Sequence, residues 1–518
     1  MKLRSLTRSL ARPLAVATAA ALSSFLWQAP DATAQKSRDT MRVATTEPFK
    51  FVDGYYFPTP EGRFVTDEVY DSLIGYDVRK RAFTPALAKS WKRIDDVTVE
   101  FELRDDVKFH NGNKFGPDDV VYIANWLLDP NTKLPFPSRF RFLKSVEKTG
   151  PNTVRFVSKE IYALDLAFIS LNMWILDSSL HKPLEDKQLY GRRTPVGTGS
   201  MKLQSFTADG NVIVERNDAY NVGDKAPIKT LRMLPIPEAQ TQIAQMLTDG
   251  VDVMRAPQPD QLKELQSNPK FKTQATNELT MASFTLDSVN RSGEAEFLKD
   301  VRVRRAVAMA IDRKGLVKEF MVKGATADDG LCFREMIGCD YTVNAPAYDP
   351  EGAKKLLAEA GWKDGFPLKI FTRPPMTDVT IAVAGMLRQV GIKAEVADMP
   401  LSVYRKMRDE GKVVARIGES PYGDIPDAGT ILDRWFGVDL RDYWRDKDIN
   451  AWMEATERTH DVNKRTEYFR NIFNKINEQS YIIPITSVPI SWVYQKDLVA
   501  QENRATIGLT FRDFSWTK

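Results

Sequence analysis

Residues able to carry out acid–base, nucleophilic or metal chemistry are few in this chain of 518 residues. It contains three histidines, His110, His181 and His460, and two cysteines. No G-x-S-x-G, H-E-x-x-H, Walker A or G-x-G-x-x-G pattern is present, and the turn at 197–200 lacks the lysine and spacing of a phosphate-binding loop. We therefore expect no enzyme, no catalytic residues, no cofactor and no metal site, although carboxylate ligands for a metal remain open.

The two cysteines are close enough in sequence to pair with each other. Cys332 and Cys339 lie in a glycine-containing loop at 331–340. In an exported protein such a pair usually forms a disulfide, and closing this eight-residue ring would contribute about 2.5 kcal/mol in the chain-entropy model. A redox-active pair is the alternative, but it would normally show the spacing C-x-x-C. We expect a disulfide that staples the loop.

The first 34 residues have the pattern of a secretory signal peptide. Four basic residues precede an apolar stretch at 14–27, and Ala32-Thr33-Ala34 forms a small-x-small site, so we expect cleavage before Gln35 and a periplasmic mature protein. An uncleaved membrane anchor is the alternative, but the apolar stretch is short for a bilayer. The whole chain carries +4; removing this segment, with four basic residues and Asp31, leaves about +1. No basic run remains that would favour nucleic acid as a partner.

Mixed helix and strand signals predict an α/β protein. Val97, Val99, Phe101 and Leu103 alternate with polar residues, as in a half-buried strand. Further strands are expected at 42–45, 153–157, 212–216, 368–371 and 394–397. Asp300 and Asp349 are expected to cap helices, the second of which has Pro350 at its first position and ends at Gly361. With a helix at 377–390, the segment 364–399 reads strand, helix, strand, the pattern of a parallel βαβ unit.

Several sequence blocks occur in a fixed order along most of the chain. They read TPALAKSW at 84–91, FELRDDVKFHNG at 101–112, FGPDDVV at 115–121, PVGTGSMKL at 195–203, DVRVRRA at 300–306 continuing to IDR at 311–313, YDPE at 348–351 continuing to GW at 361–362, and GDIPD at 423–427. This series resembles the family-five extracellular solute-binding proteins, the dipeptide-, oligopeptide- and nickel-binding group that serves ABC importers. Ser200, Met201 and Ala428 depart from the residues usual in that pattern.

The resemblance implies a two-lobed periplasmic binding protein fold, large and of type II, with two hinge crossings and an extra subdomain in the first lobe. The first lobe would comprise 35–285 and 485–518, with the subdomain at about 76–195, and the second lobe 286–484. We place the hinges at 285–287 and 481–485. Most signature residues would be scaffold, including His110 and the turn at 197–199.

The resemblance also indicates where a ligand would bind. A peptide carries an ammonium and a carboxylate, and burying it requires a fixed acid and a fixed base, because an unpaired buried charge costs several kcal/mol. Asp424 lies in the block where relatives place the acid for the ammonium. Arg373 precedes a proline, as does the arginine with which dipeptide-binding relatives hold the carboxylate, and its fork suits that group. Alternatively, Arg373 pairs with a surface acid and Asp424 caps a turn.

The aromatic residues Tyr422, Trp435 and Phe436 flank Asp424 and could line the pocket for a ligand side chain; core packing is the alternative. We expect a monomer that binds a di- or oligopeptide and presents it to the transmembrane subunits of an ABC permease. The same fold binding a metal chelate, an opine or an oligosaccharide is the second hypothesis. An exported hydrolase or a chaperone is the third, and no motif supports it.

Overall fold

The structure is a computed structural model that describes residues 38–517 except 58, 136, 194, 277–278, 323, 328–329, 334, 340–343, 422–424, 437–441 and 502–508. The chain divides into the units Met1–Arg38 and Asp39–Lys518, and the described residues lie almost entirely in the second. The predicted signal peptide, 1–34, lies outside the described residues. Among the residues that are described, no helix combines the length and apolarity needed to cross a bilayer.

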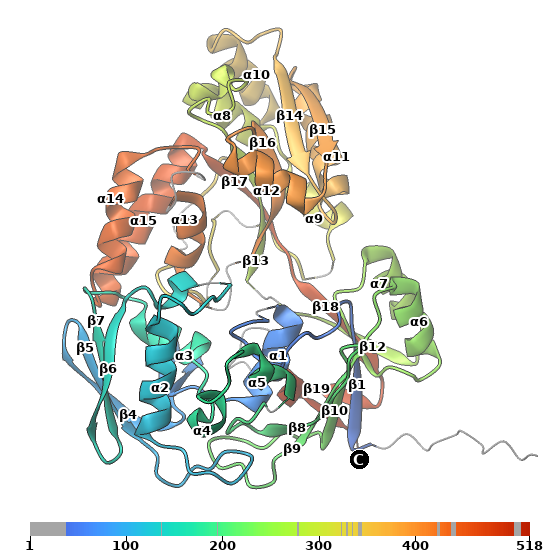
Figure 1. The fold of residues 1–518 in the computed structure, drawn as a ribbon. Helices are drawn as coiled ribbons and strands as arrows, with labels where there is room; N and C mark the ends of the chain where they lie inside the picture. The colour runs from blue at the N-terminus through green and yellow to red at the C-terminus, as the bar shows by residue number, and fades with distance from the viewer. Residues whose placement is uncertain are drawn as a thin grey trace, which may run out of the picture. The chain divides into compact units, whose positions relative to one another are not determined.

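A seven-stranded sheet brings together strands from both ends of the chain (Figure 1). In spatial order it contains β12 Phe271–Thr276, β18 Ile490–Gln495, β11 Val253–Arg255, β1 Thr40–Thr45, β10 Thr230–Pro235, β9 Val212–Arg216 and β8 Met201–Phe206. β1 is parallel to β10 and β11, and the other neighbours are antiparallel. The helices of this region are α1 Pro60–Val69, α6 Ala239–Leu247 and α7 Pro259–Gln266. The strands predicted at 42–45 and 212–216 are confirmed as β1 and β9.

A second, four-stranded antiparallel sheet follows α1 in the chain. Its order is β4 Ala88–Asp95, β5 Thr98–Leu103, β7 Thr153–Ser158 and β6 Leu143–Gly150. Val99, Phe101 and Leu103 are buried, as their alternation predicts. The accompanying elements are the hairpin β2 Ile74–Asp77 and β3 Ala82–Pro85, helices α2 Pro117–Leu128, α3 Asp165–Asn172, α4 Ser178–His181 and α5 Gln188–Arg193, and the 3₁₀ turn η1 Pro137–Phe140. Near the chain end lie β19 Leu498–Ala500, η3 Phe511–Asp513 and β20 Phe514–Trp516.

A five-stranded sheet forms the centre of the remaining part. Its order is β15 Lys393–Asp398, β14 Pro367–Thr372, β16 Ala415–Pro421, β13 Thr280–Leu286 and β17 Ile482–Ser487. β14 is parallel to β15 and β16, whereas β13 is antiparallel to β16 and β17. β14, α11 Thr377–Gln389 and β15 form the predicted strand–helix–strand unit. The other elements are η2 Glu296–Lys299, α8 Val301–Met309, α9 Arg313–Phe320, α10 Pro350–Glu359, α12 Leu401–Asp409, α13 Ala428–Phe436, α14 Lys447–Glu457 and α15 Val462–Gln479.

The predicted helix boundaries follow from side-chain capping. Asp300 accepts a hydrogen bond from the Arg302 amide at the start of α8, and Asp349 accepts one from the Gly352 amide at the start of α10, each at 2.8 Å. These bonds satisfy amides that have no partner within the helix. Gly361, with φ +85°, follows α10 and reverses the chain in a conformation that disfavours other residues. Both predicted caps are therefore confirmed.

The molecule is a two-lobed α/β protein of the periplasmic binding protein type. The chain passes between the seven-stranded and five-stranded sheets twice, from β12 to β13 and from β17 to β18. The crossings thus lie before β13 and after β17. The residues predicted as hinges, 285–287 and 481–485, lie towards the other ends of these two strands, where Thr285 pairs with Ile482 inside the sheet. The loop-like composition after 287 therefore belongs to the turn that follows β13.

Candidate functional site

Three parallel strands of the five-stranded sheet end at one edge. β15, β14 and β16 run in the same direction, so their carboxyl ends face the same side of the sheet. β14 and β15 end level with each other, whereas β16 begins beside the end of β14, where Phe371 pairs with Arg416, and extends beyond it. β13 begins at this edge and β17 ends there, as the pair Met281 and Ser487 shows, so both crossings to the seven-stranded sheet leave from it. In open α/β sheets ligands bind outside the carboxyl ends of the strands. We call this the carboxyl edge.

Arg373 lies at the carboxyl edge, directly after β14. Its Nη1 donates to the Pro374 carbonyl oxygen at 2.9 Å, and its Nη2 lies 3.5 Å from Glu419 Oε2 on β16. Its Nε is buried and has no hydrogen-bond partner among the described residues. The side chain is 33% exposed. Arg373 thus has an acidic neighbour, as the alternative interpretation expected, yet part of its hydrogen-bonding capacity is unused.

An open pocket of about 370 Å³ adjoins Arg373. It is lined by Arg373, Pro374, Asp398, Met399 and Pro400. Asp398 is the last residue of β15, stands opposite Thr372 in the register, and accepts a hydrogen bond from the Thr377 hydroxyl at 2.7 Å. The pocket has the volume of a small-ligand site and presents one cation and one anion. The sequence analysis missed Asp398, although the rule that ligands bind at strand ends would have indicated it.

Arg416 and Glu419 of β16 add two more charges beside Arg373. The Arg416 guanidinium folds back over Gly418, lies 4.7 Å from the Tyr404 ring centroid, and donates to the Glu419 carbonyl oxygen at 3.2 Å. A side chain at position 418 would collide with it. Burial raises the pKa of Glu419, an effect that the guanidinium groups of Arg373 and Arg416 oppose; burial also lowers the pKa of Arg416. Both residues were missed, although charges in a buried strand are a detectable signal.

Tyr422 and Asp424, two of the residues predicted to bind the ligand, lie outside the described residues. β16 ends at Pro421, the last described residue before this gap. Asp427, on the other side of this gap, is fully buried. It accepts two hydrogen bonds from Arg465 at 2.8 and 2.9 Å, and one from the Gly429 amide at 2.9 Å. The segment after Asp424 is therefore fixed to the helices α13 and α15.

Trp435 and Phe436 lie at the end of α13. They are 7% and 4% exposed and belong to a hydrophobic cluster with Ile431, Phe469 and Ile472. The Phe436 ring lies 4.8 Å from that of Trp444. Their contacts are thus those of core residues.

The surroundings of His110 and His181 indicate that these side chains have a structural role. His110 Nε2 lies 3.0 Å from the Gly199 carbonyl oxygen, and the Gly197 amide donates to its Nδ1 at 3.3 Å, so the ring fixes the turn at 197–199 as expected. Burial lowers the pKa of His110 to about 4 and that of His181 to about 3. No group of three or more His, Cys, Asp or Glu side chains within the described residues is arranged to hold a metal ion.

Comparisons with known proteins identify bacterial binding proteins. The family model for "Bacterial extracellular solute-binding proteins, family 5 Middle" matches residues 82–439. Heme-binding protein A of Haemophilus influenzae is 27% identical over 68% of this chain and 68% of its own length. Di/tripeptide-binding protein 1 of Pseudomonas aeruginosa is 25% identical over 83% of this chain and 84% of its own.

A solved structure shows the same fold. The ABC transporter substrate-binding protein CtaP from Listeria monocytogenes superimposes with a TM-score of 0.83 at 18% sequence identity, covering 92% of this chain and 99% of that one. The likeness extends over both lobes.

Proposed function

Because the chain belongs to the bacterial extracellular solute-binding proteins of family five, we propose that it captures a di- or short oligopeptide and delivers it to an ABC permease. The ligand shifts an equilibrium between open and closed arrangements of the lobes, and the permease recognises the closed form. No bond in the ligand changes, so the protein is not an enzyme. It acts as a monomer in the periplasm after cleavage before Gln35.

The observation that carries the ligand assignment is the position of Arg373 at the carboxyl edge. Its side chain is 33% exposed and lines the pocket, which leaves room for a carboxylate, a group that an arginine fork binds well. Asp424 follows β16 in sequence, and we assign to it the charge that pairs with the ligand ammonium. Each charge-assisted contact contributes about 1.5–3 kcal/mol. Tyr422 would border the ligand, whereas the burial of Trp435 and Phe436 favours a supporting role for these two residues.

The proposed lobes are 35–285 with 485–518, and 286–484, with the extra subdomain at about 76–195. The separate seven-stranded and five-stranded sheets support two lobes, with all of β13 and β17 in the sheet of the second lobe. The four-stranded sheet supports the subdomain because its strands β4–β7 all fall within 76–195.

A metal chelate is the second ligand class that we consider. One relative is named as a heme-binding protein, and a chelate with carboxylate arms would bind Arg373 as a peptide carboxylate does. Native mass spectrometry of mature protein purified from a periplasm separates the classes. A small adduct whose fragments are amino acids supports a peptide, an adduct with a metal isotope pattern supports a chelate, and a sugar adduct contradicts both.

Asp424→Ala tests the assignment of the ammonium site. We expect the affinity for alanyl-leucine, measured by calorimetric titration, to fall at least about tenfold, because the ammonium loses its counter-charge. The N-acetylated peptide, which has no ammonium, should bind the wild-type and variant proteins equally weakly. Unchanged affinity of the variant for alanyl-leucine would refute the site, whereas no binding by the wild-type protein would refute the peptide ligand.

A further inference from the structure

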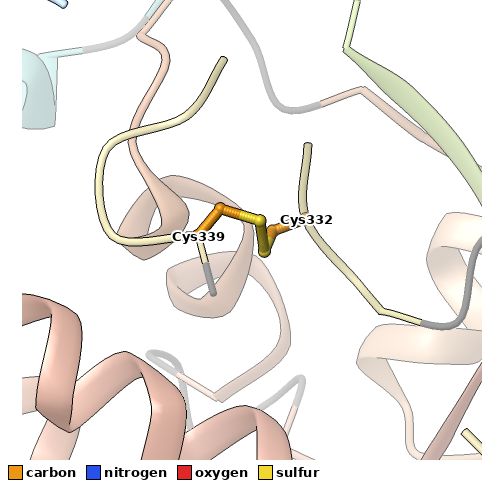
Figure 2. Close-up of a disulfide and its surroundings, with 2 residues drawn as sticks. All are labelled: Cys332 and Cys339. Atoms are coloured by element: carbon orange, nitrogen blue, oxygen red, sulfur yellow. A yellow bond between two sulfur atoms is a disulfide. The ribbon is translucent and has the colours of Figure 1, made fainter. Parts of the chain in front are cut away.

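The disulfide between Cys332 and Cys339 closes a small ring beside the segment that follows Asp424. Figure 2 shows the bond joining the two arms of the loop, and the Cα atoms are 5.7 Å apart. The predicted pairing is confirmed. We call residues 332–339 the disulfide ring.

The disulfide ring forms a short ladder with the chain at 425–428. The Ile337 amide donates to the Pro426 carbonyl oxygen at 2.8 Å, and the Ala428 amide donates to the Ile337 carbonyl oxygen at 3.0 Å. Ile337 and Asp427 thereby form a parallel bridge. Ile337 lies within the covalent ring, so both hydrogen bonds connect the segment to a loop whose ends cannot separate.

The disulfide ring is itself anchored in the core. Phe333 and Met336 are buried in the same hydrophobic cluster as Ala428 and Phe469. Gly338 has φ +81° and packs so closely against the Phe469 ring of α15 that a Cβ atom would overlap it. The position of the ring relative to α13 and α15 is therefore determined by close packing as well as by the disulfide.

We infer that the disulfide ring positions the segment Ile425–Ala428 and, through it, the ligand-binding end of β16. One face of the segment is held by the two hydrogen bonds to Ile337, and the other by the ion pair of Asp427 with Arg465. Asp424, the proposed partner of the ligand ammonium, directly precedes the segment in sequence, so under the proposed function a displacement of the segment lowers the affinity for the peptide. The effect on affinity rests on the proposed function, whereas the effect on the segment does not.

Two variants disturb the ring in different ways. Cys332→Ser with Cys339→Ser removes the covalent closure, and Gly338→Ala keeps the disulfide but forces the ring away from Phe469. The control is Val383→Ala, which weakens the core of the same lobe, because Val383 is fully buried on α11 and lies in the cluster under the five-stranded sheet. All three are made in the full mature protein.

Two readouts decide the inference. Hydrogen exchange of the Ala428 amide should accelerate about tenfold in both ring variants and not in the control, because exchange reports local opening. The affinity for alanyl-leucine should fall about tenfold in the same two variants. Unchanged exchange at Ala428 overturns the inference whether or not the peptide binds. Faster exchange with unchanged affinity shows that the ring holds the segment without serving the ligand, which also overturns it.

If the wild-type protein binds no peptide, the proposed function fails, while the exchange measurement still decides whether the ring positions the segment.

Discussion

Two arginine–carboxylate pairs of the second lobe differ in how completely their charges are satisfied. Arg465 and Asp427 are 5% and 1% exposed and share two hydrogen bonds, while Arg465 Nε donates to the Thr456 carbonyl oxygen. Arg373 and Glu419 are 33% and 18% exposed and approach only to 3.5 Å.

The difference indicates two roles. A buried charge must be compensated by its partner, and the geometry of the Arg465–Asp427 pair provides that compensation. The Arg373–Glu419 pair is loose and lies beside a pocket, so Arg373 can donate to a ligand carboxylate without losing a well-formed hydrogen bond. We interpret the first pair as scaffold and the second as part of the ligand site.

The largest expected effect is on stability, from breaking the buried pair. Asp427→Asn removes the charge that compensates Arg465, and we expect a loss of about 3–5 kcal/mol in the free energy of unfolding, measured with urea. Asp118→Asn, which breaks the exposed pair with Lys148, is the control and should change stability by less than about 1 kcal/mol. Similar losses in the two variants would remove the distinction between a scaffold pair and a surface pair.

The next effect is on affinity. Arg373→Gln should weaken binding of alanyl-leucine about tenfold to a hundredfold, because a charge-assisted bond worth about 1.5–3 kcal/mol is lost. Binding of the C-terminal amide of the same peptide, measured by calorimetry, should differ little between the variant and the wild-type protein. If both peptides lose affinity equally, Arg373 supports the fold of the pocket and does not contact the carboxylate.

The smallest effect is expected from the carboxylate of the loose pair. Glu419→Gln should change the free energy of unfolding at pH 7 by less than about 1 kcal/mol and should not weaken peptide binding, because Arg373 loses only a distant partner. The pKa of Glu419 is raised in the folded protein, so the folded state binds its proton more readily than the unfolded state does. The wild-type protein should therefore gain stability relative to the variant as the pH falls from 7 towards 4.

Urea titrations of both proteins across this pH range test the Glu419 prediction. A loss of several kcal/mol in Glu419→Gln at pH 7 would make the two pairs equivalent and contradict the comparison.

Much of the fold could be predicted because its signals are local. The alternation in β5, the caps Asp300 and Asp349, and the strand–helix–strand unit of β14, α11 and β15 depend on neighbouring residues. The crossings between the lobes were placed at the wrong ends of β13 and β17. A strand that is buried on both sides is apolar along its whole length, so its sequence does not indicate at which end the chain leaves the lobe. The insertion of β18 between β11 and β12 pairs residues that are remote in sequence, and no local pattern records it.

The site was predictable only in part. Arg373 was found because it follows a recognisable strand and precedes a proline. Glu419 is 46 positions away, and Asp427 and Arg465 are 38 positions apart, so their contacts depend on the register of strands and helices. The sequence does not distinguish the roles of the two aspartates of GDIPD at 423–427. In the structure, Asp427 is paired with the buried Arg465.

The location of β18 has a consequence for the order in which the protein folds. β12 pairs only with β18 in the seven-stranded sheet, so this sheet cannot be completed until residues 490–495 are free to pair. The five-stranded sheet uses only 280–487 and can assemble earlier. Until β18 pairs, β11 and β12 expose unpaired edges that other chains can join. The seven-stranded sheet therefore stays incomplete, and open to aggregation, until β18 pairs.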